Sequence, residues 1–527
     1  MRRCLLVALL TVSGLTAATL RVPVGGDLAA AVTQARSLPR PVTIELADGT
    51  HYLPATLRLG PRDSGLTFAA APGAHPVLSG GRLVSGWQVR DGVWETTLPD
   101  VAAGAWRPRQ LFVGGQRATV CRTPNEGFFR VAGYDEAQPK RAFTFNAGEL
   151  DAWPDLGAAT LVVLHSWETS VMPIASVDPA KRHVVLGGDC VWNFGYWNSP
   201  QRWYVEGVAA AFDAPGEWHL DEPTGRLRYR PLPGHSPEST PVVAANLTEL
   251  VSLSGDQRLG LPVTDVRFTG LTFAHGDWLL PPAGHSDPQA VCTEGGNISL
   301  RGAIGCSFDD CRFVHLGSYA VALRAGSRAC RVERCEFADV GAGAVRIGET
   351  YVSREPELRC EGHVVDNCWV HDYGRVFAGG VGIWLAQAGD CRISHNDIHD
   401  GWYTGISVGW DWGRAPTASH GNQILDNHIH HIVNGRLSDA GGIYTLGELD
   451  GGRLAGNVIH DLFAFTEPDY SWGIYLDSES HGLTVEDNTV WAVEDGLMLH
   501  NGAYNNIVRR NTFAQAADYL IWRSPAC

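Results

Sequence analysis

Short apolar phrases return at long intervals in the second half of the chain. Between residues 379 and 502, a four-residue phrase that begins with glycine occurs five times. The phrases are GIWL from Gly382, GISV from Gly405, GIYT from Gly442, GIYL from Gly473 and GLML from Gly496. Repeats of 20–50 residues are typical of solenoids, and short β-branched runs without a helical period favour strands. The pattern therefore predicts a β-helix in which each phrase forms one strand.

A second phrase, apolar-x-x-Asn-x-apolar, follows each glycine phrase and extends the pattern in both directions. We expect its first position to point inward at Phe308, Val332, Val364, Ile393, Ile424, Leu454, Val485 and Val508. We expect the same of its last position at Phe313, Phe337, Trp369, Ile398, Ile429, Ile459, Val490 and Phe513. The asparagines suit a left-handed turn, with amides that hydrogen-bond up the stack, at Asn367, Asn396, Asn427, Asn457, Asn488 and Asn511. Eight stacked turns with one inward pattern predict an all-β parallel β-helix.

The first half of the chain divides into segments that differ in repeat pattern and in aromatic content. An Ala-rich stretch at 28–38 predicts a short helix that caps the first coil, and strands follow at 42–46, 57–59, 66–69 and 76–79. From about Arg107 to Asp213 the repeat of apolar positions is lost and aromatic residues cluster. An alternating pattern typical of a hairpin starts at Gly216. We predict a leader at 1–18, a cap and first coils at 19–106, an inserted β-rich domain at 107–213, and the main β-helix at 214–527.

Composition and charge narrow the classes of partner. Arg2, Arg3 and an apolar run from Leu5 to Leu10 are typical of a secretory signal, so we expect an exported protein. Without those two arginines, 39 basic residues stand against 57 acidic ones, which argues against nucleic acid or anionic lipid as partner. No later stretch is apolar enough to span a membrane.

Cysteine and histidine patterns do not predict a metal or a cofactor. Cys306, Cys311, Cys330 and Cys335 repeat at an interval of 24, one coil, so they should stack as buried thiols or form an oxidised pair. No CxxC pair or His/Cys spacing indicates zinc. Four histidines recur with the asparagine column and are interpreted as structural, namely His371, His399, His430 and His460.

Coil lengths indicate where a cleft lies. The coil from Asn488 to Asn511 takes 23 residues, but the four coils before it take 29 to 31. The surplus must leave the coils as loops, at 371–381, 409–421, 431–441 and 461–472, all beside the glycine-phrase strands. Loops on a rigid scaffold commonly carry function, so we expect them to wall a cleft over that face.

Aromatic residues gather at this face. The third residue of each phrase points outward, giving Trp384, Ser407, Tyr444, Tyr475 and Met498, and four further tryptophans stand nearby, Trp402, Trp410, Trp412 and Trp472. An outward aromatic row on an acidic, exported protein favours stacking against sugar rings.

Two aspartates complete the candidate site. Asp477 follows the GIYL strand, and Asp439 opens the loop that enters GIYT one coil earlier. Paired carboxylates are what glycoside hydrolysis needs. On straight strands the two aspartates would lie about 20 Å apart, so their pairing requires the loop to fold Asp439 back over the strand. Asp411, Glu448 and Glu479 are reserve acids, and His500 stands one coil beyond Asp477.

Longer motifs carry a family resemblance. The runs LSDAGGIYTLG, NVIHD, SWGIYLD, NNIVRRNTFA and GISVGWDWG resemble glycoside hydrolase family 141. So do LFVGGQRATVCRTPNEGFF from Leu111, HSWETS from His165 and DAPGEWHLD from Asp213. The resemblance implies a right-handed parallel β-helix and a secreted hydrolase of plant cell-wall glycans, with fucosidase or xylanase activity. It places the catalytic aspartates on Asp439 and Asp477. The chain departs from the family's pattern at residues 477–480, DSES instead of DEGS, and at 498–500, MLH instead of an HQH-like triplet.

Other classes stay open at this point. Many β-helices are polysaccharide lyases or epimerases that use a basic residue, but the long coils contain no lysine, which leaves Arg414 or Arg436. A non-catalytic glycan-binding protein is the third interpretation. The last coil ends without a polar cap after Ile521, so we expect either that the sequence is a truncated version of its kind or that a partner covers this edge.

Overall fold

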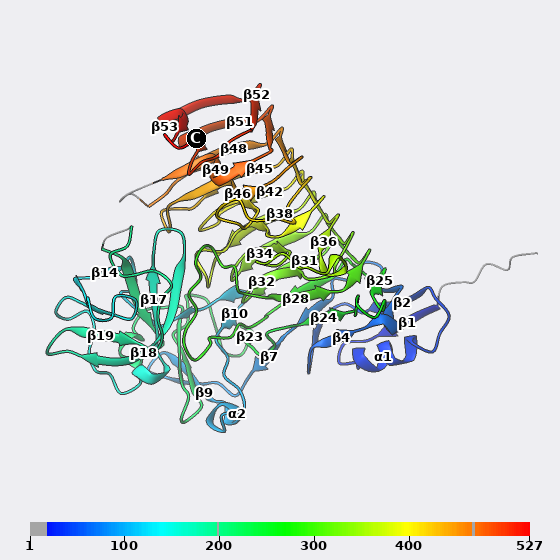
Figure 1. The fold of residues 1–527 in the computed structure, drawn as a ribbon. Coiled ribbons are helices and arrows are strands. Elements are labelled where there is room, and N and C mark those ends of the chain that lie inside the picture. Colours follow the sequence, from blue (N-terminus) through cyan, green and yellow to red (C-terminus); the bar gives the residue numbers. More distant parts are fainter. Residues whose placement is uncertain (1–17, 198–199, 466–469) are drawn as a thin grey trace, which may run out of the picture.

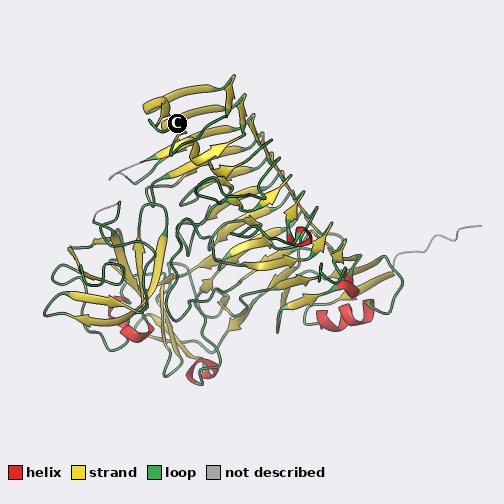
Figure 2. Cartoon of the chain, in the orientation of Figure 1, coloured by secondary structure: helices red, strands yellow, loops and turns green. Residues whose placement is uncertain are grey.

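The computed structural model describes residues 18–197, 200–465 and 470–527. The predicted leader lies outside these residues, apart from Ala18. The chain winds into a parallel β-helix, with an antiparallel β domain beside its C-terminal half (Figure 1). Helices are short and peripheral (Figure 2). They are α1 (Leu28–Ala35), α2 (Pro99–Ala102) and the single turns Pro61–Asp63, Leu156–Ala158, Ala209–Ala211 and Pro356–Leu358. No helix in the described part of the chain is long and apolar enough to cross a membrane.

Three ladders of parallel strands form the β-helix. The first contains β1 (Ala18–Val22), β2 (Val42–Leu46), β5 (Leu66–Ala70), β26 (Arg267–Thr269), β30 (Ser307–Asp309), β33 (Arg331–Glu333), β37 (Val364–Asp366), β41 (Arg392–Ser394), β44 (Gln423–Leu425), β47 (Arg453–Ala455), β50 (Thr484–Glu486) and β52 (Ile507–Arg509). The second contains β3 (Thr50–Tyr52), β6 (Val77–Ser79), β27 (Thr272–Ala274), β31 (Arg312–Leu316), β34 (Glu336–Val340), β38 (Trp369–Tyr373), β42 (Asp397–His399), β45 (His428–Ile432) and β48 (Val458–Leu462). The third contains β4 (Leu57–Leu59), β24 (Val251–Ser254), β28 (Gly296–Arg301), β32 (Tyr319–Leu323), β35 (Val345–Ile347), β39 (Ile383–Leu385), β43 (Ile406–Val408), β46 (Ala440–Glu448) and β49 (Ser471–His481). The last two coils join the second and third ladders in the long strands β51 (Thr489–Leu499) and β53 (Thr512–Arg523), and two minor pairs are β25 (Val263–Thr264) with β29 (Ala303–Ile304) and β36 (Cys360–Glu361) with β40 (Ala388–Gly389).

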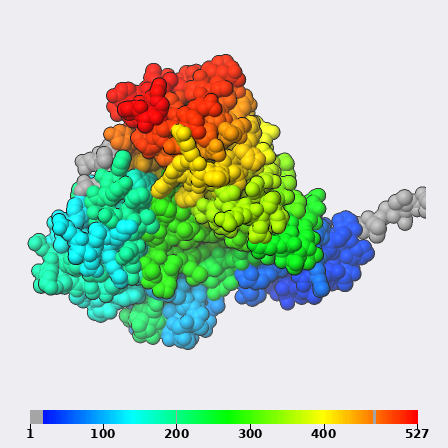
Figure 3. Space-filling model, in the orientation of Figure 1, coloured from blue at the N-terminus to red at the C-terminus, as the bar shows by residue number. Residues whose placement is uncertain are grey.

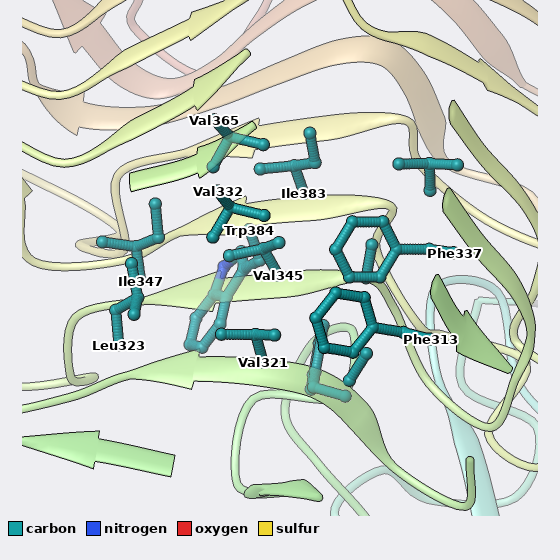
Figure 4. Packing of buried hydrophobic residues seen from close by; sticks show 14 of the residues in the cluster. Phe313, Val321, Leu323, Val332, Phe337, Val345, Ile347, Val365, Ile383 and Trp384 are labelled. Atoms are coloured by element: carbon teal, nitrogen blue, oxygen red, sulfur yellow. The ribbon is translucent and has the colours of Figure 1, made fainter. Parts of the chain in front are cut away.

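The core consists of identical positions stacked from coil to coil (Figure 4). Phe273, Phe313 and Phe337 stack with ring centroids 5.2 and 4.6 Å apart, which is close to the spacing of the strands that carry them. The predicted inward columns are confirmed in register, except in one coil. There Val365 and Val370 point inward, and not Val364 and Trp369; Trp369 is 45% exposed. The predicted frame in this coil was therefore wrong by one residue.

The asparagine ladder explains that slip. Each asparagine amide donates to the amide oxygen of the next asparagine up the stack, at 2.9–3.0 Å. The order is Asn396, Asn427, Asn457, Asn488 and Asn511. In the coil below, the equivalent position is Cys368, whose backbone N–H donates to Asn396 Oδ1 at 3.0 Å. Asn367 stands one residue earlier and has a positive φ, as His395 does. The residue with the left-handed conformation is thus the one that precedes each ladder position. The expectation that the ladder asparagines themselves adopt this conformation was wrong.

The described cysteines are free thiols, and all but Cys527 are buried. Cys311, Cys335 and Cys368 continue the asparagine column downward, while Cys306 and Cys330 form a neighbouring pair. Buried thiols thus take the place of the amides in these coils.

The inserted part is wider than 107–213, since the chain leaves the coils after β6 and returns at β24. Its eight-stranded sheet consists of β13 (Arg122–Thr123), β14 (Phe129–Arg130), β15 (Gly133–Tyr134), β16 (Ala142–Thr144), β17 (Thr160–Leu164), β18 (Thr169–Asp178), β19 (His183–Leu186) and β20 (Arg202–Glu206). Two smaller sheets consist of β8 (Gln88–Arg90), β9 (Val93–Thr97), β12 (Thr119–Val120), β21 (Glu217–Asp221) and β22 (Arg226–Tyr229), and of β7 (Gly81–Val84), β10 (Leu111–Val113), β11 (Gln116–Arg117) and β23 (Val242–Ala245). The predicted hairpin is β21–β22, but β22 continues the sheet through β9. Strands of either architecture share a period of two, so residues 81–97 gave no sign of the change.

Candidate active site

A cavity of about 660 Å³ lies between the C-terminal coils and the inserted domain. The space-filling view shows the insertion, in cyan and teal, beside the orange coils (Figure 3). The coils contribute Asp439, Tyr444, Tyr470, Trp472, Tyr475, Asp477, Asp495, Met498, His500, Asn501, Tyr519 and Trp522. This volume is typical of pockets that bind small molecules or part of a larger ligand.

The floor of the cavity is the predicted outward column. Trp384, Ser407, Tyr444, Tyr475, Met498 and Trp522 occupy one register position on successive strands. The last four line the cavity. Trp384 does not, because it is 1% exposed, with the Arg346 guanidinium 4.7 Å from its ring and Trp410 against its edge. Its prediction as a ligand contact is corrected on this point.

The other predicted tryptophans divide equally. Trp412 and Trp472 line the cavity, and Trp472 donates from its indole N–H to Asp495 at 3.0 Å. Trp410 packs edge to face on Trp384 instead. Trp402 lies between the guanidinium groups of Arg375 and Arg436. Both therefore belong to loop packing, which the outward position alone could not reveal.

Asp477 is held by two donors. It lies in β49 and is 7% exposed. The Tyr444 hydroxyl donates to Oδ2 at 2.8 Å, and the Asn501 amide donates to Oδ1 at 2.9 Å. The following residues, Ser478 and Glu479, have positive φ and form a bulge after the carboxylate. Bulges often reorient a side chain next to an active site, and here both carboxylate oxygens are fixed by hydrogen bonds.

Asp439 occupies a different environment. It directly precedes β46, has φ of 54°, and its N–H donates to the Tyr470 carbonyl at 2.7 Å. Burial, followed by the charge of Asp477, raises the pKa of its carboxyl, and a hydrogen bond from the Tyr475 hydroxyl lowers it; the net pKa is about 7. Asp439 therefore holds its proton more tightly than an ordinary aspartate does.

The strand that follows Asp439 runs close to the core, and its tyrosine reaches the other acid. A Cβ on Gly442 would stand 2.5 Å from Ile459 Cγ2, so only glycine permits this close approach of the strand to the core. Tyr475 reaches Asp439 from the neighbouring coil, while Tyr444 reaches Asp477. The tyrosine rings are 4.9 Å apart. Each tyrosine therefore contacts the acid of the other coil.

The reserve acids lie elsewhere. Asp411 accepts a hydrogen bond from the Gln387 amide, Glu448 pairs with His481 at 3.2 Å, and Glu479 pairs with Arg414 at 2.6 Å. None of them lines the cavity. His500 does, and it stacks on Trp522 at 5.7 Å; burial lowers its pKa, against an opposing effect of Asp477.

The wall opposite the β-helix was missed by sequence reasoning. The inserted domain contributes Trp167, Trp192, Tyr196 and Trp197. Trp192 stacks on Tyr196 at 4.8 Å and on Trp412 of the β-helix at 6.3 Å. The aromatic clustering in this segment was visible, but its position over the coils depends on how the insertion docks.

The insertion also holds the loop that carries Asp439. The Ser438 N–H donates to the Ser166 carbonyl at 2.8 Å. Arg202 donates to the carbonyls of Gly435 and Arg436, at 3.1 Å for the former, and its guanidinium lies 3.4 Å from the Phe465 ring centroid. Burial and the neighbouring Arg130 lower the pKa of Arg202 to about 9. These contacts connect the insertion to the backbone immediately before Asp439.

Comparison with known proteins places this fold. A family model described as a right-handed β-helix region matches residues 296–460. A solved structure titled "Glycoside hydrolase" is 22% identical, with a TM-score of 0.84 over 94% of this chain and 97% of its own. Another, "The complex structure of XylC with xylose", is 15% identical, with a TM-score of 0.51 over 94% of this chain and 71% of its own. No curated protein matches. The chain has the right-handed parallel β-helix fold, which confirms the predicted fold class.

Proposed function

We propose that the protein is a glycoside hydrolase that acts in the aromatic cavity with Asp439 and Asp477. The observation that carries the proposal is that two acids with different surroundings line one cavity. At neutral pH a large fraction of Asp439 holds its proton, since its pKa is about 7. Asp477 instead accepts two hydrogen bonds, as a carboxylate does. Glycoside hydrolysis needs a carboxyl group that keeps its proton, to act as the acid, and a second carboxyl group to act as the nucleophile or base.

In the proposed reaction each aspartate has its own role. Asp439 protonates the oxygen of the departing sugar, and Asp477 either attacks the anomeric carbon or activates a water. The first route leaves the configuration of the product retained, and the second inverts it. Tyr444 and Asn501 orient Asp477, and Tyr475 orients Asp439. The configuration of the first product, followed by NMR, distinguishes the routes.

Aromatic residues on both sides of the cavity favour a carbohydrate as substrate. Tyr475, Trp472 and Trp522 lie on the β-helix side, and Trp192 and Trp197 on the insertion side. Sugar rings present apolar faces that stack on such side chains. The resemblance to family 141 and the likeness to a structure solved with xylose favour a plant cell-wall glycan, with fucosidase-like or xylanase-like cleavage. An exported protein, as the leader at 1–18 predicts, would meet such polymers.

The two arginines considered as the base of a lyase lie outside the cavity. Arg414 is paired with Glu479, and Arg436 lies over Trp402. Neither is among the residues that line the cavity. The aspartate pair therefore fits hydrolysis better than proton abstraction by arginine.

The test is a screen of purified protein on cell-wall polysaccharides and nitrophenyl glycosides, with reducing ends and product absorbance measured together. We expect new reducing ends without an unsaturated product. Asp439→Asn and Asp477→Asn should each lower turnover by several orders of magnitude. An unsaturated product would indicate a lyase, and binding without cleavage in the wild type would indicate a glycan-binding protein; either result contradicts the proposal.

A further inference from the structure

Two columns of polar side chains run along the outer face of the second ladder, outside the cavity. His371, His399, His430 and His460 occupy one register position, with ring centroids 5.3, 4.9 and 5.2 Å apart. Asp397 and His428 occupy the position two residues earlier on β42 and β45. Because both positions point outward, the stacking brings Asp397, His428 and His430 together on two neighbouring coils.

Three ligand atoms converge at this point. Asp397 Oδ1 lies 3.2 Å from His428 Nδ1 and 3.1 Å from His430 Nε2. All three lie within 4.8 Å of one another. Zinc binds imidazole and carboxylate at about 2.0–2.2 Å in a tetrahedron, which places ligand atoms about 3.3 Å apart. The two distances from Asp397 Oδ1 to the histidine nitrogens are therefore close to those between ligand atoms of a zinc site.

The second nitrogen of each imidazole has its own partner. His428 Nε2 lies 2.9 Å from His460 Nε2, and His460 Nδ1 lies 2.6 Å from Asp461 Oδ2. His430 Nδ1 lies 2.8 Å from His431 Nδ1. One set of tautomers satisfies all these contacts: His428 donates to His460, His460 donates to Asp461, and His430 donates to His431. Metal-bound histidines usually donate their other N–H in this way.

In these tautomers the two nitrogens that face Asp397 carry no proton, whereas in the other tautomer His430 Nε2–H would donate to Asp397 Oδ1 at 3.1 Å. With the protons on His428 Nε2 and His430 Nδ1, the lone pairs of His428 Nδ1 and His430 Nε2 point toward the carboxylate. The neighbouring His399 shows the contrast, because its Nε2 accepts from the Trp369 indole at 2.7 Å and its Nδ1 contacts Asp400 at 2.7 Å. His399 thus has no nitrogen to offer a metal.

We propose that Asp397, His428 and His430 bind a zinc ion. The ion would fasten β42 to β45, with water at its fourth position, because the Asp397 and His428 side chains are 47% and 44% exposed. The ligands come from two coils, which is why the expectation of no metal, based on spacing along the chain, did not detect them. The site is separate from the cavity, so the proposal does not depend on hydrolase activity.

The test is calorimetric titration of ZnCl₂ into chelator-treated protein in a non-coordinating buffer. We expect one equivalent bound in the micromolar range, and a rise in melting temperature with zinc. Asp397→Ala and His428→Ala should weaken binding by at least about 100-fold, and His460→Ala by about 10–100-fold. His371→Ala, which removes a histidine of the same column outside the cluster, should bind zinc as the wild type does.

Cobalt provides a second readout. Substituted into the site, Co²⁺ should show visible absorption typical of low coordination, absent in His428→Ala. Circular dichroism and metal-free melting temperature establish that each variant is folded. Failure of the folded wild type to bind zinc at submillimolar concentration would overturn the proposal. The proposal would also be overturned if His371→Ala weakened zinc binding as much as His428→Ala does. It would be overturned as well if Asp461→Asn abolished zinc binding while Asp397→Ala kept it in full, because that result would place the metal on His431, His460 and Asp461.

Discussion

Replacing Asp439 by asparagine should stabilise the protein while it abolishes turnover. The folded protein raises the pKa of this carboxyl from 3.8 to about 7. It therefore binds the proton more tightly than the unfolded chain does, and the free energy of unfolding falls as the pH rises between those values. Each pKa unit corresponds to about 1.36 kcal/mol, so the loss above pH 7 is about 4 kcal/mol at most. The side chain keeps some contact with the solvent of the cavity, and we expect about 2–4 kcal/mol.

Asparagine has the shape of the protonated acid but no charge to bury. Asp439→Asn should thus be more stable than the wild type above about pH 7, and equally stable near pH 4. Urea denaturation at the two pH values, followed by tryptophan fluorescence, measures the difference. Asp477→Asn is the matched control, because its carboxylate accepts two hydrogen bonds that asparagine cannot accept equally. Equal stability of Asp439→Asn and wild type above pH 7, or a loss at both pH values, would refute the reasoning.

Four further outcomes follow from the site. In the wild type, kcat/KM should fall as the pH rises through about 7, because Asp439 must be protonated to act as the acid. A pH profile that is flat across that range would contradict the assignment of Asp439 as the acid. Trp197→Ala should raise KM severalfold with little change in kcat. Trp369→Ala, which removes a tryptophan of similar exposure on the outer face, should change neither. Identical kinetics for the two variants would show that the insertion takes no part in substrate binding. Arg202→Met should lower kcat more than it raises KM and should shift the alkaline limb of the pH profile, because it releases the loop before Asp439. An unchanged kcat with an unshifted alkaline limb would show that the loop does not need this support. EDTA should leave the rate of hydrolysis unchanged, because the proposed zinc ligands lie outside the cavity, and a loss of activity on chelation would mean that a metal takes part in the reaction.

The repeat of apolar and polar positions was enough to predict the β-helix and its columns. In a parallel stack each coil places equivalent residues directly above one another, so a local pattern, repeated, determines the long-range neighbours. Ile393, Ile424 and Leu454 therefore lie in the predicted column. The same reasoning misplaced Val364 and Trp369, because an asparagine one residue before the ladder looked like a member of it.

The tertiary structure decided what the outward residues do. Trp384 and Tyr444 share one register position, yet a loop covers the first and a cavity opens over the second. Which of them meets a ligand depends on how the loops and the insertion pack, and those contacts join segments far apart in the sequence. The aromatic wall from Trp167 to Trp197, the raised pKa of Asp439 and the cluster of Asp397, His428 and His430 all arise in this way. A sequence pattern records periodicity along the chain, and these features depend on distances across it.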